Sequence, residues 1–162
     1  MIEQLDMLVR FWELRARHAD GDWPLSHGER IELLSLLQLL AAQADGEARN
    51  SRHGPRRSLP GQLTAGTGFL AAEIQELSHD RIVVGAAETV PLGHRTILYI
   101  ADALSGVEYA VPCQVAWSRH DAPCLIGLTP DGAASRTTFT APVPGLWRSP
   151  LGIGPTGHRV RA

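Results

Sequence analysis

Apolar positions recur at helical spacing in the first part of the chain. Over residues 2–18 and 27–44 they fall three and four positions apart, which is the period of an amphipathic helix. Residues 20–24, rich in aspartate, glycine and proline, interrupt the pattern, and Ser26 followed by Glu29 has the form of a capping box. The pattern therefore predicts a helical hairpin over residues 1–45.

Farther along, apolar and polar positions alternate with the period of a β-strand. Six short runs have this character: 59–64, 68–77, 81–85, 96–101, 107–119 and 122–129. No helical stretch separates them, so the pattern favours an antiparallel barrel or sandwich over residues 46–132. A polar segment at 45–58 joins it to the hairpin, and the proline- and glycine-rich residues 133–162 are expected to form an irregular tail. The expected fold class is α+β.

The second predicted helix carries more leucine than one partner helix can cover. Leu33, Leu36, Leu37 and Leu40 share one face, which Ile31, Leu34 and Leu39 widen. Either the strand-rich region or a second copy of the chain must cover the remainder. These four leucines and Trp12 are therefore the predicted interaction face of a homo-oligomer, and plain packing within one chain is the alternative.

Composition excludes several classes of partner. The 162 residues are 44% hydrophobic and 20% charged, and their net charge is −2, so the whole chain is not attracted to nucleic acid or to anionic membranes. Any anion site must be local. The longest apolar run, residues 31–42, contains Glu32 and is too short to span a bilayer. The N-terminus is acidic, unlike a signal peptide, and a cytoplasmic location is expected.

One polar constellation stands out between residues 52 and 81. It begins with Arg52, Arg56 and Arg57 in a segment broken by glycine and proline, and guanidinium groups of this kind bind phosphates and stack on purines. It ends with Glu76 and Ser78 after the second predicted strand. There a carboxylate can accept hydrogen bonds from a guanine edge and a hydroxyl can bind phosphate. A solvated linker is the simpler interpretation of the arginines alone.

The order of these residues resembles the PilZ domain, a bacterial receptor module for cyclic di-GMP. The family has RxxxR in an N-terminal loop, then [D/N]xSxxG, on a six-stranded antiparallel barrel. Here Arg52-x-x-x-Arg56 precedes Glu76-x-Ser78-x-x-Arg81, and residues 115–119 and 126–128 are similar to the family's later strands. The resemblance covers about residues 50–132.

The resemblance implies roles for individual residues. Arg52 and Arg56, with Arg57 as a substitute, would hold the ligand's phosphates and a guanine, and Glu76 and Ser78 would complete the site. Two positions depart from the family: Glu76 replaces Asp or Asn, and Arg81 replaces Gly. Arg81 is expected to pair with Glu76 or Asp80 and block the pocket, or else to donate to a phosphate.

The resemblance also implies a regulatory function. A cyclic di-GMP receptor of this kind, or a degenerate relative, would act through an effector protein in the control of motility, adhesion or exopolysaccharide. The alternative is a scaffold that has lost the nucleotide and works through its helical hairpin. An enzyme is the third class, but no nucleophile, base or metal-ligand set is evident, and no cofactor is expected.

Overall fold

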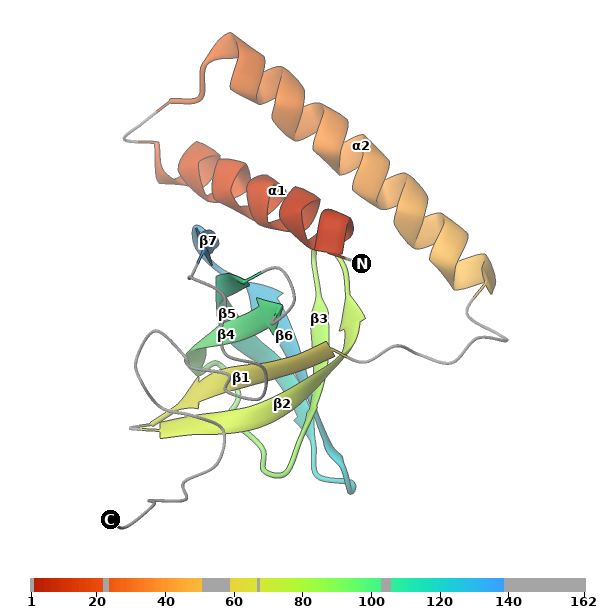
Figure 1. Ribbon diagram of the computed structural model, residues 1–162, viewed down its shortest axis with the longest axis vertical. Helices are drawn as coiled ribbons and strands as arrows, with labels where there is room; N and C mark the ends of the chain where they lie inside the picture. The colour runs from red at the N-terminus through yellow and green to blue at the C-terminus, as the bar shows by residue number, and fades with distance from the viewer. Residues whose placement is uncertain (1, 22–23, 51–58, 67, 103–105, 139–162) are drawn as a thin grey trace.

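The computed structural model describes residues 2–21, 24–50, 59–66, 68–102 and 106–138. Two helices precede a closed six-stranded antiparallel barrel and one further strand, which confirms the predicted fold class (Figure 1). The helices are α1 (Ile2–Asp20) and α2 (His27–Asn50). The strands are β1 (Leu59–Ala65), β2 (Gly68–Leu77), β3 (Ile82–Ala86), β4 (Arg95–Asp102), β5 (Val107–Arg119), β6 (Cys124–Pro130) and β7 (Ser135–Thr138).

The barrel closes because each of its six strands pairs with two neighbours. The ring runs β1–β2–β3–β6–β5–β4, and β4 returns to β1, where Leu63 lies beside Leu98. All pairs are antiparallel. Closure pairs each of these six strands on both sides over part of its length, which limits the edge that is open to another chain.

Two differences from the sequence-based expectation are larger than two residues. α2 does not end near Ala44 but continues to Asn50, because the alanine, glutamate and arginine after Gly46 favour helix and one glycine costs only about 1 kcal/mol. The expected irregular tail contains β7, which pairs with residues 107–110 of β5 beyond the end of β6. β7 has the sequence Ser-Arg-Thr-Thr and lacks the apolar alternation that would have revealed it.

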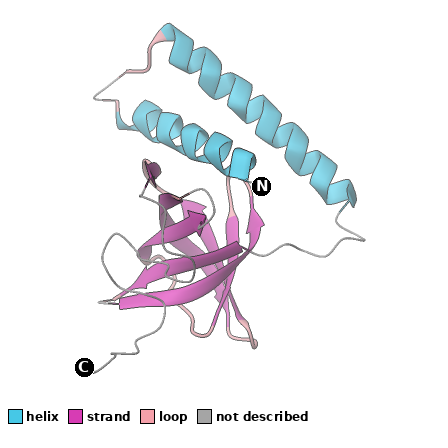
Figure 2. Cartoon of the chain, viewed as in Figure 1, coloured by secondary structure: helices cyan, strands magenta, loops and turns pink. Residues whose placement is uncertain are grey.

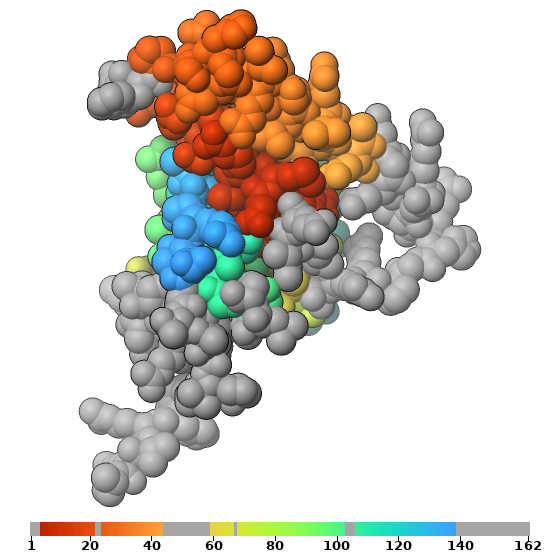
Figure 3. Space-filling model, turned by 45° about the horizontal axis from the view of Figure 1, so that its top comes forward, coloured from red at the N-terminus to blue at the C-terminus, as the bar shows by residue number. Residues whose placement is uncertain are grey.

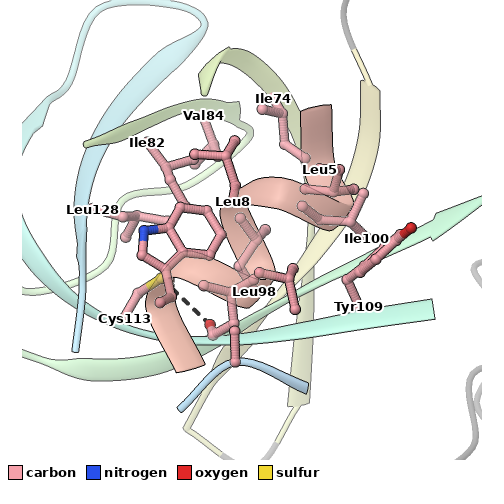
Figure 4. Close-up of a cluster of buried hydrophobic side chains, with 14 of the residues drawn as sticks. Leu5, Leu8, Ile74, Ile82, Val84, Leu98, Ile100, Tyr109, Cys113 and Leu128 are labelled. Atoms are coloured by element: carbon pink, nitrogen blue, oxygen red, sulfur yellow. Dashed lines mark hydrogen bonds between the residues drawn. The ribbon is translucent and has the colours of Figure 1, made fainter. Parts of the chain in front are cut away.

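α1 supplies part of the barrel's core. Its apolar face packs over one end of the barrel, so that Leu5 and Leu8 lie among side chains from β2, β3, β4 and β5 (Figure 4). Trp12 is fully buried in the same cluster. The main contributors from the barrel are Ile74, Ile82, Val84, Leu98, Ile100, Tyr109, Val111 and Leu128. α1 is therefore an integral part of the fold.

Polar contacts fix α1 on the barrel as well. The Tyr109 hydroxyl donates to Asp6 Oδ1 at 2.8 Å, and Arg136 Nε lies 3.1 Å from the same oxygen. At the other end of the helix, Arg15 donates to the carbonyl of Pro130 at 2.7 Å. Because these bonds reach β5, β6 and β7, the position of α1 is set by several strands at once.

α2 packs on the far side of α1, and both helices gather at one end of the barrel (Figure 2). Arg10 makes two hydrogen bonds to the Glu32 carboxylate, at 2.9 and 2.8 Å. The predicted capping box is confirmed: the Ser26 amide donates to Glu29, and the Glu29 amide donates to Ser26 Oγ. These bonds and Arg17 hold the pKa of the Glu29 carboxyl at about 2.

The burial of the hairpin changes the predicted interaction face. Trp12 and Leu40 are buried in the core and are unavailable to a partner in this structure, and Leu33 and Leu36 are half-buried against the same cluster. Leu37 is exposed. The period of α2 located its apolar positions correctly, but it could not distinguish the side facing α1 from the side facing solvent, because leucine occurs on both.

We predict that Gly127→Ala on β6 destabilises the barrel. A Cβ atom at this position would lie 2.2 Å from the ring of Trp117 on the neighbouring strand, so the ring would have to move. Overpacking of this kind costs about 1–3 kcal/mol of unfolding free energy, measurable by urea denaturation. Gly68→Ala is the control, because the nearest atom to its added Cβ is a backbone oxygen at 4.0 Å. Equal stability of the two variants would contradict the prediction.

Candidate functional site

The second half of the predicted site is a tight turn between β2 and β3. The Ser78 amide donates to the carbonyl of Arg81 at 2.9 Å. The Ser78 hydroxyl lies 2.8 Å from that carbonyl and 2.9 Å from Asp80 Oδ1, so its hydrogen is committed to the turn. The Ser78 oxygen can still accept a hydrogen bond, but it is not a free donor.

A β-bulge positions Glu76 on this turn. The pairing of β2 with β3 shifts between Ile74 and Glu76, so Gln75 is the extra residue. A bulge bends its strand and redirects the side chains that follow, and bulges are common beside functional sites. Glu76 then stands next to Arg81, and Arg81 Nη2 lies 2.5 Å from Glu76 Oε1. Of the two partners expected for Arg81, the structure therefore shows Glu76.

This ion pair is open to water. The side chains of Arg81 and Glu76 are 56% and 47% exposed. Exposed pairs contribute only about 0.2–1 kcal/mol, since water and salt screen them. The pair occupies the carboxylate that a guanine would need, but it is a weak obstacle to a ligand.

The backbone at Arg81 does not require glycine. No residue other than glycine has a positive φ among the described residues, so Arg81 lies in an ordinary backbone conformation. One of the two reasons for a glycine at this position, a left-handed backbone, is therefore absent from this chain. The remaining reason is close approach of a ligand, which the Arg81 side chain would affect.

The turn is rich in negative charge. Burial alone would raise the pKa of the Asp80 carboxyl, but hydrogen bonds from Ser78 and from the Asp80 amide hold that pKa below its usual value. Asp80 is therefore ionised at neutral pH, like an ordinary carboxylate. With Glu76, the turn offers two carboxylates against the single guanidinium of Arg81. It cannot attract a phosphate by itself.

The turn is also in direct contact with α1. Trp12 Nε1 donates to the carbonyl of His79 at 2.8 Å, and the rings of Phe11 and His79 meet edge to face with centroids 6.0 Å apart. Sequence reasoning missed this contact, because neither Trp12 nor His79 carries a local signal of a pairing across 67 residues. The hairpin and the candidate site are thus adjacent parts of one structure.

Arg52, Arg56 and Arg57 lie outside the described residues. The start of β1 is described: Leu59 pairs with Ile74, two residues before Glu76.

A separate surface groove lies elsewhere. It has a volume of about 490 Å³ and follows β2, β3 and the start of β6, and among the described residues Glu76, Ser78 and Arg81 do not line it. Its lining is mainly alanine, with Glu73, Gly85, Pro123 and Cys124. A hollow of only about 20 Å³ lies between the hairpin and the turn, beside Leu40, Ser78 and His79.

Two further features concern only the described part of the chain. Within it, no three His, Cys, Asp or Glu side chains come together as metal ligands. The helices described are each too short or too polar to cross a membrane.

Comparison with known proteins gives a structural likeness. No protein-family model matches this sequence, and no curated protein matches it. Among solved structures, the YcgR-N domain of YcgR from Escherichia coli is similar to it at 10% sequence identity and a TM-score of 0.36. That match covers 58% of this chain and 84% of the Escherichia coli domain.

Proposed function

We propose that this chain is a PilZ-like regulatory binding protein of the bacterial cytoplasm. It would bind cyclic di-GMP between the arginine segment and the β2–β3 turn, and would act on a partner protein in the control of motility, adhesion or exopolysaccharide. One observation carries the proposal. Glu76, Ser78 and Arg81 meet on one turn of a closed six-stranded barrel, beside the strand that directly follows Arg52, Arg56 and Arg57.

In this proposal the arginine segment binds the phosphates of the ligand, and the β2–β3 turn binds a guanine. Cyclic di-GMP carries two phosphates, and the carboxylate-rich turn repels them, so Arg52 and Arg56 must supply the positive charge. The Glu76 carboxylate suits a guanine instead, because it can accept hydrogen bonds from the N–H groups of the base. In this assignment Ser78 accepts a hydrogen bond, since its own hydrogen stays within the turn.

Binding a guanine at Glu76 requires Arg81 to leave the carboxylate. That exchange costs about 0.2–1 kcal/mol, which lowers the affinity by at most about 5-fold. A retained guanine contact to a charged group contributes about 1.5–3 kcal/mol, which is larger. The ion pair therefore attenuates binding without abolishing it.

We predict that Arg81→Gly binds cyclic di-GMP up to about 5-fold more tightly than the unmodified chain, because Glu76 no longer needs to be released. Isothermal titration measures both affinities. The matched control is Arg119→Gly. It removes an exposed arginine at the C-terminal end of β5, which is paired with Asp121. Weaker binding by Arg81→Gly would instead make Arg81 a phosphate donor. If neither the unmodified chain nor Arg81→Gly gives heat with cyclic di-GMP at tens of micromolar protein, the receptor proposal is wrong.

A nucleotide-independent scaffold is the second candidate. Two observations favour it. The Glu76 carboxylate is paired with Arg81, and α2 leaves an apolar surface exposed. Deleting residues 1–44 is not a clean test, because α1 belongs to the core. Substitutions on the exposed side of α2 test it with the barrel intact: they should abolish partner capture, while Arg52→Ala with Arg56→Ala leaves capture unchanged. The opposite pattern would exclude the scaffold.

A further inference from the structure

Two consecutive polar side chains, Gln75 and Glu76, face outward from β2 because of the bulge. Successive side chains of a regular strand point to opposite faces, so residues three positions apart do not share one face. Here Ile74 is buried in the core and Leu77 nevertheless packs against the same core. The extra residue permits this, since the pairing with β3 shifts after Ile74. Both residues between Ile74 and Leu77 are therefore on the outer face of the barrel.

The Gln75 side chain extends over β3 at Gly85. Gly85 lies between Val84 and Ala86, which both belong to the core, so a side chain at Gly85 would point outward. A Cβ atom built on Gly85 would lie 2.8 Å from Gln75 Nε2. The Gln75 amide thus occupies the space that the glycine leaves open on the outer face of β3.

This amide and the Glu76 carboxylate are neighbours on that face. Glu76 is opposite Val83, and Gly85 is two residues farther along β3, a separation of about 7 Å. α1 and α2 lie together at one end of the molecule (Figure 3), and Gln75 lies three residues before the start of the turn that contacts α1. Gln75 is only half-buried, so the two side chains are open to a ligand at the side of the barrel.

The Gln75 amide is free to bind a ligand. Within the described part of the chain it takes part in no hydrogen bond. Glu76, in contrast, is paired with Arg81, and the Ser78 hydrogen is held within the turn. An amide offers two N–H donors and one C=O acceptor. Gln75 therefore supplies the free donor that Ser78 does not.

A donor beside a carboxylate distinguishes guanine from adenine. Guanine has N–H groups at N1 and N2 and an acceptor at O6 beside them, whereas adenine has an acceptor at N1 and an amino group at N6. When N1–H and N2–H of a guanine donate to Glu76, an amide N–H of Gln75 can donate to O6. With adenine the carboxylate would face an acceptor. The two side chains together therefore favour guanine.

We propose that Gln75 is a specificity-determining residue of the ligand site: its amide donates to O6 of the guanine whose N–H groups donate to Glu76. This inference rests on the proposed function, and it adds the residue that recognises O6. The extra residue of the bulge then has a chemical role, because a strand without it would lack this donor.

Isothermal titration of the full chain with cyclic di-GMP tests the contact. Gln75→Ala should bind about 2- to 10-fold more weakly than the unmodified chain, because one neutral hydrogen bond is lost. Gln75→Glu should bind at least about 10-fold more weakly, since a carboxylate would face O6. The matched controls are Gln114→Ala and Gln114→Glu on β5, where the Gln114 amide donates to the carbonyl of Gly93. Both controls should leave the affinity unchanged.

Cyclic di-AMP tests the specificity. The unmodified chain should bind it more weakly than cyclic di-GMP, and Gln75→Ala should narrow that difference. If the unmodified chain binds cyclic di-GMP and Gln75→Ala binds it equally tightly, or if the ratio of the two affinities is unchanged, the role of Gln75 is wrong and the proposed function stands. If the unmodified chain does not bind cyclic di-GMP, the proposed function itself is wrong.

Gly85→Ala tests the position of the amide. The added Cβ would displace only the flexible end of Gln75, so the free energy of unfolding should be unchanged while the affinity falls as it does in Gln75→Ala. In the Gln75→Ala background, Gly85→Ala should cause no further loss, because both variants remove the same contact. Additive losses would mean that the amide does not act from its place over Gly85, and would overturn the proposal.

Discussion

Trp12→Ala should lower the free energy of unfolding by about 3–5 kcal/mol, the usual cost of removing a large buried aromatic side chain. Trp12 is fully buried between α1 and the barrel, so its loss leaves a cavity in the main core. It also removes the indole hydrogen bond to the carbonyl of His79. A small domain is stable by only about 5–15 kcal/mol, so the variant would lose a large part of its stability.

Urea denaturation followed by circular dichroism provides the measurement. Leu92→Ala is the control: Leu92 is 72% exposed, and surface substitutions usually change stability by less than about 0.5 kcal/mol. Trp12→Phe should fall between the two, since it keeps most of the buried ring but loses the hydrogen bond. A Trp12→Ala loss below about 1 kcal/mol would mean that α1 is not part of the core in solution.

Arg52→Ala combined with Arg56→Ala should weaken cyclic di-GMP binding by at least about 100-fold. Each lost hydrogen bond to a charged group costs about 1.5–3 kcal/mol, or about 10- to 150-fold. The rest of the site cannot compensate, because the described turn carries two carboxylates and one guanidinium that is already paired. Loss of both arginines therefore leaves the ligand's phosphates facing net negative charge.

Isothermal titration compares the double variant with the unmodified chain. Arg95→Ala is the control, because Arg95 is an exposed arginine on the barrel that pairs with Asp131. Unchanged affinity in the double variant would mean that Arg52 and Arg56 do not bind the ligand. Equal losses in the double variant and in Arg95→Ala would indicate a general effect of net charge.

The features that the sequence predicts are those whose pattern lies within one short segment of the chain. The helices and the six strands of the barrel were predictable, because alternating or three-to-four spacing is written within each segment. The pairing of Arg81 was predictable as one of two choices, since Glu76 and Asp80 both lie near it in the chain. The arginine cluster remains a sequence-based prediction, because it lies outside the described residues.

The unpredicted features are contacts between distant segments or segments without apolar residues. The bond from Trp12 to His79 joins a helix to a turn 67 residues farther along the chain, and no spacing rule connects them. β7 is a polar strand that forms because β5 extends beyond β6 and offers free backbone groups. The solvent side of α2 was hidden because its inner and outer leucines look alike in sequence.

The bond from Trp12 to the carbonyl of His79 has a thermodynamic consequence for the proposed ligand binding. It joins the candidate ligand turn to α1, and Arg10 joins α1 to Glu32 on α2, so a short chain of contacts connects the turn with both helices. Linkage between two coupled equilibria is reciprocal. If the packing of α1 on the barrel changes the affinity for cyclic di-GMP by some factor, the ligand must change the packing equilibrium of α1 by the same factor, and Trp12→Phe should bring that factor closer to one.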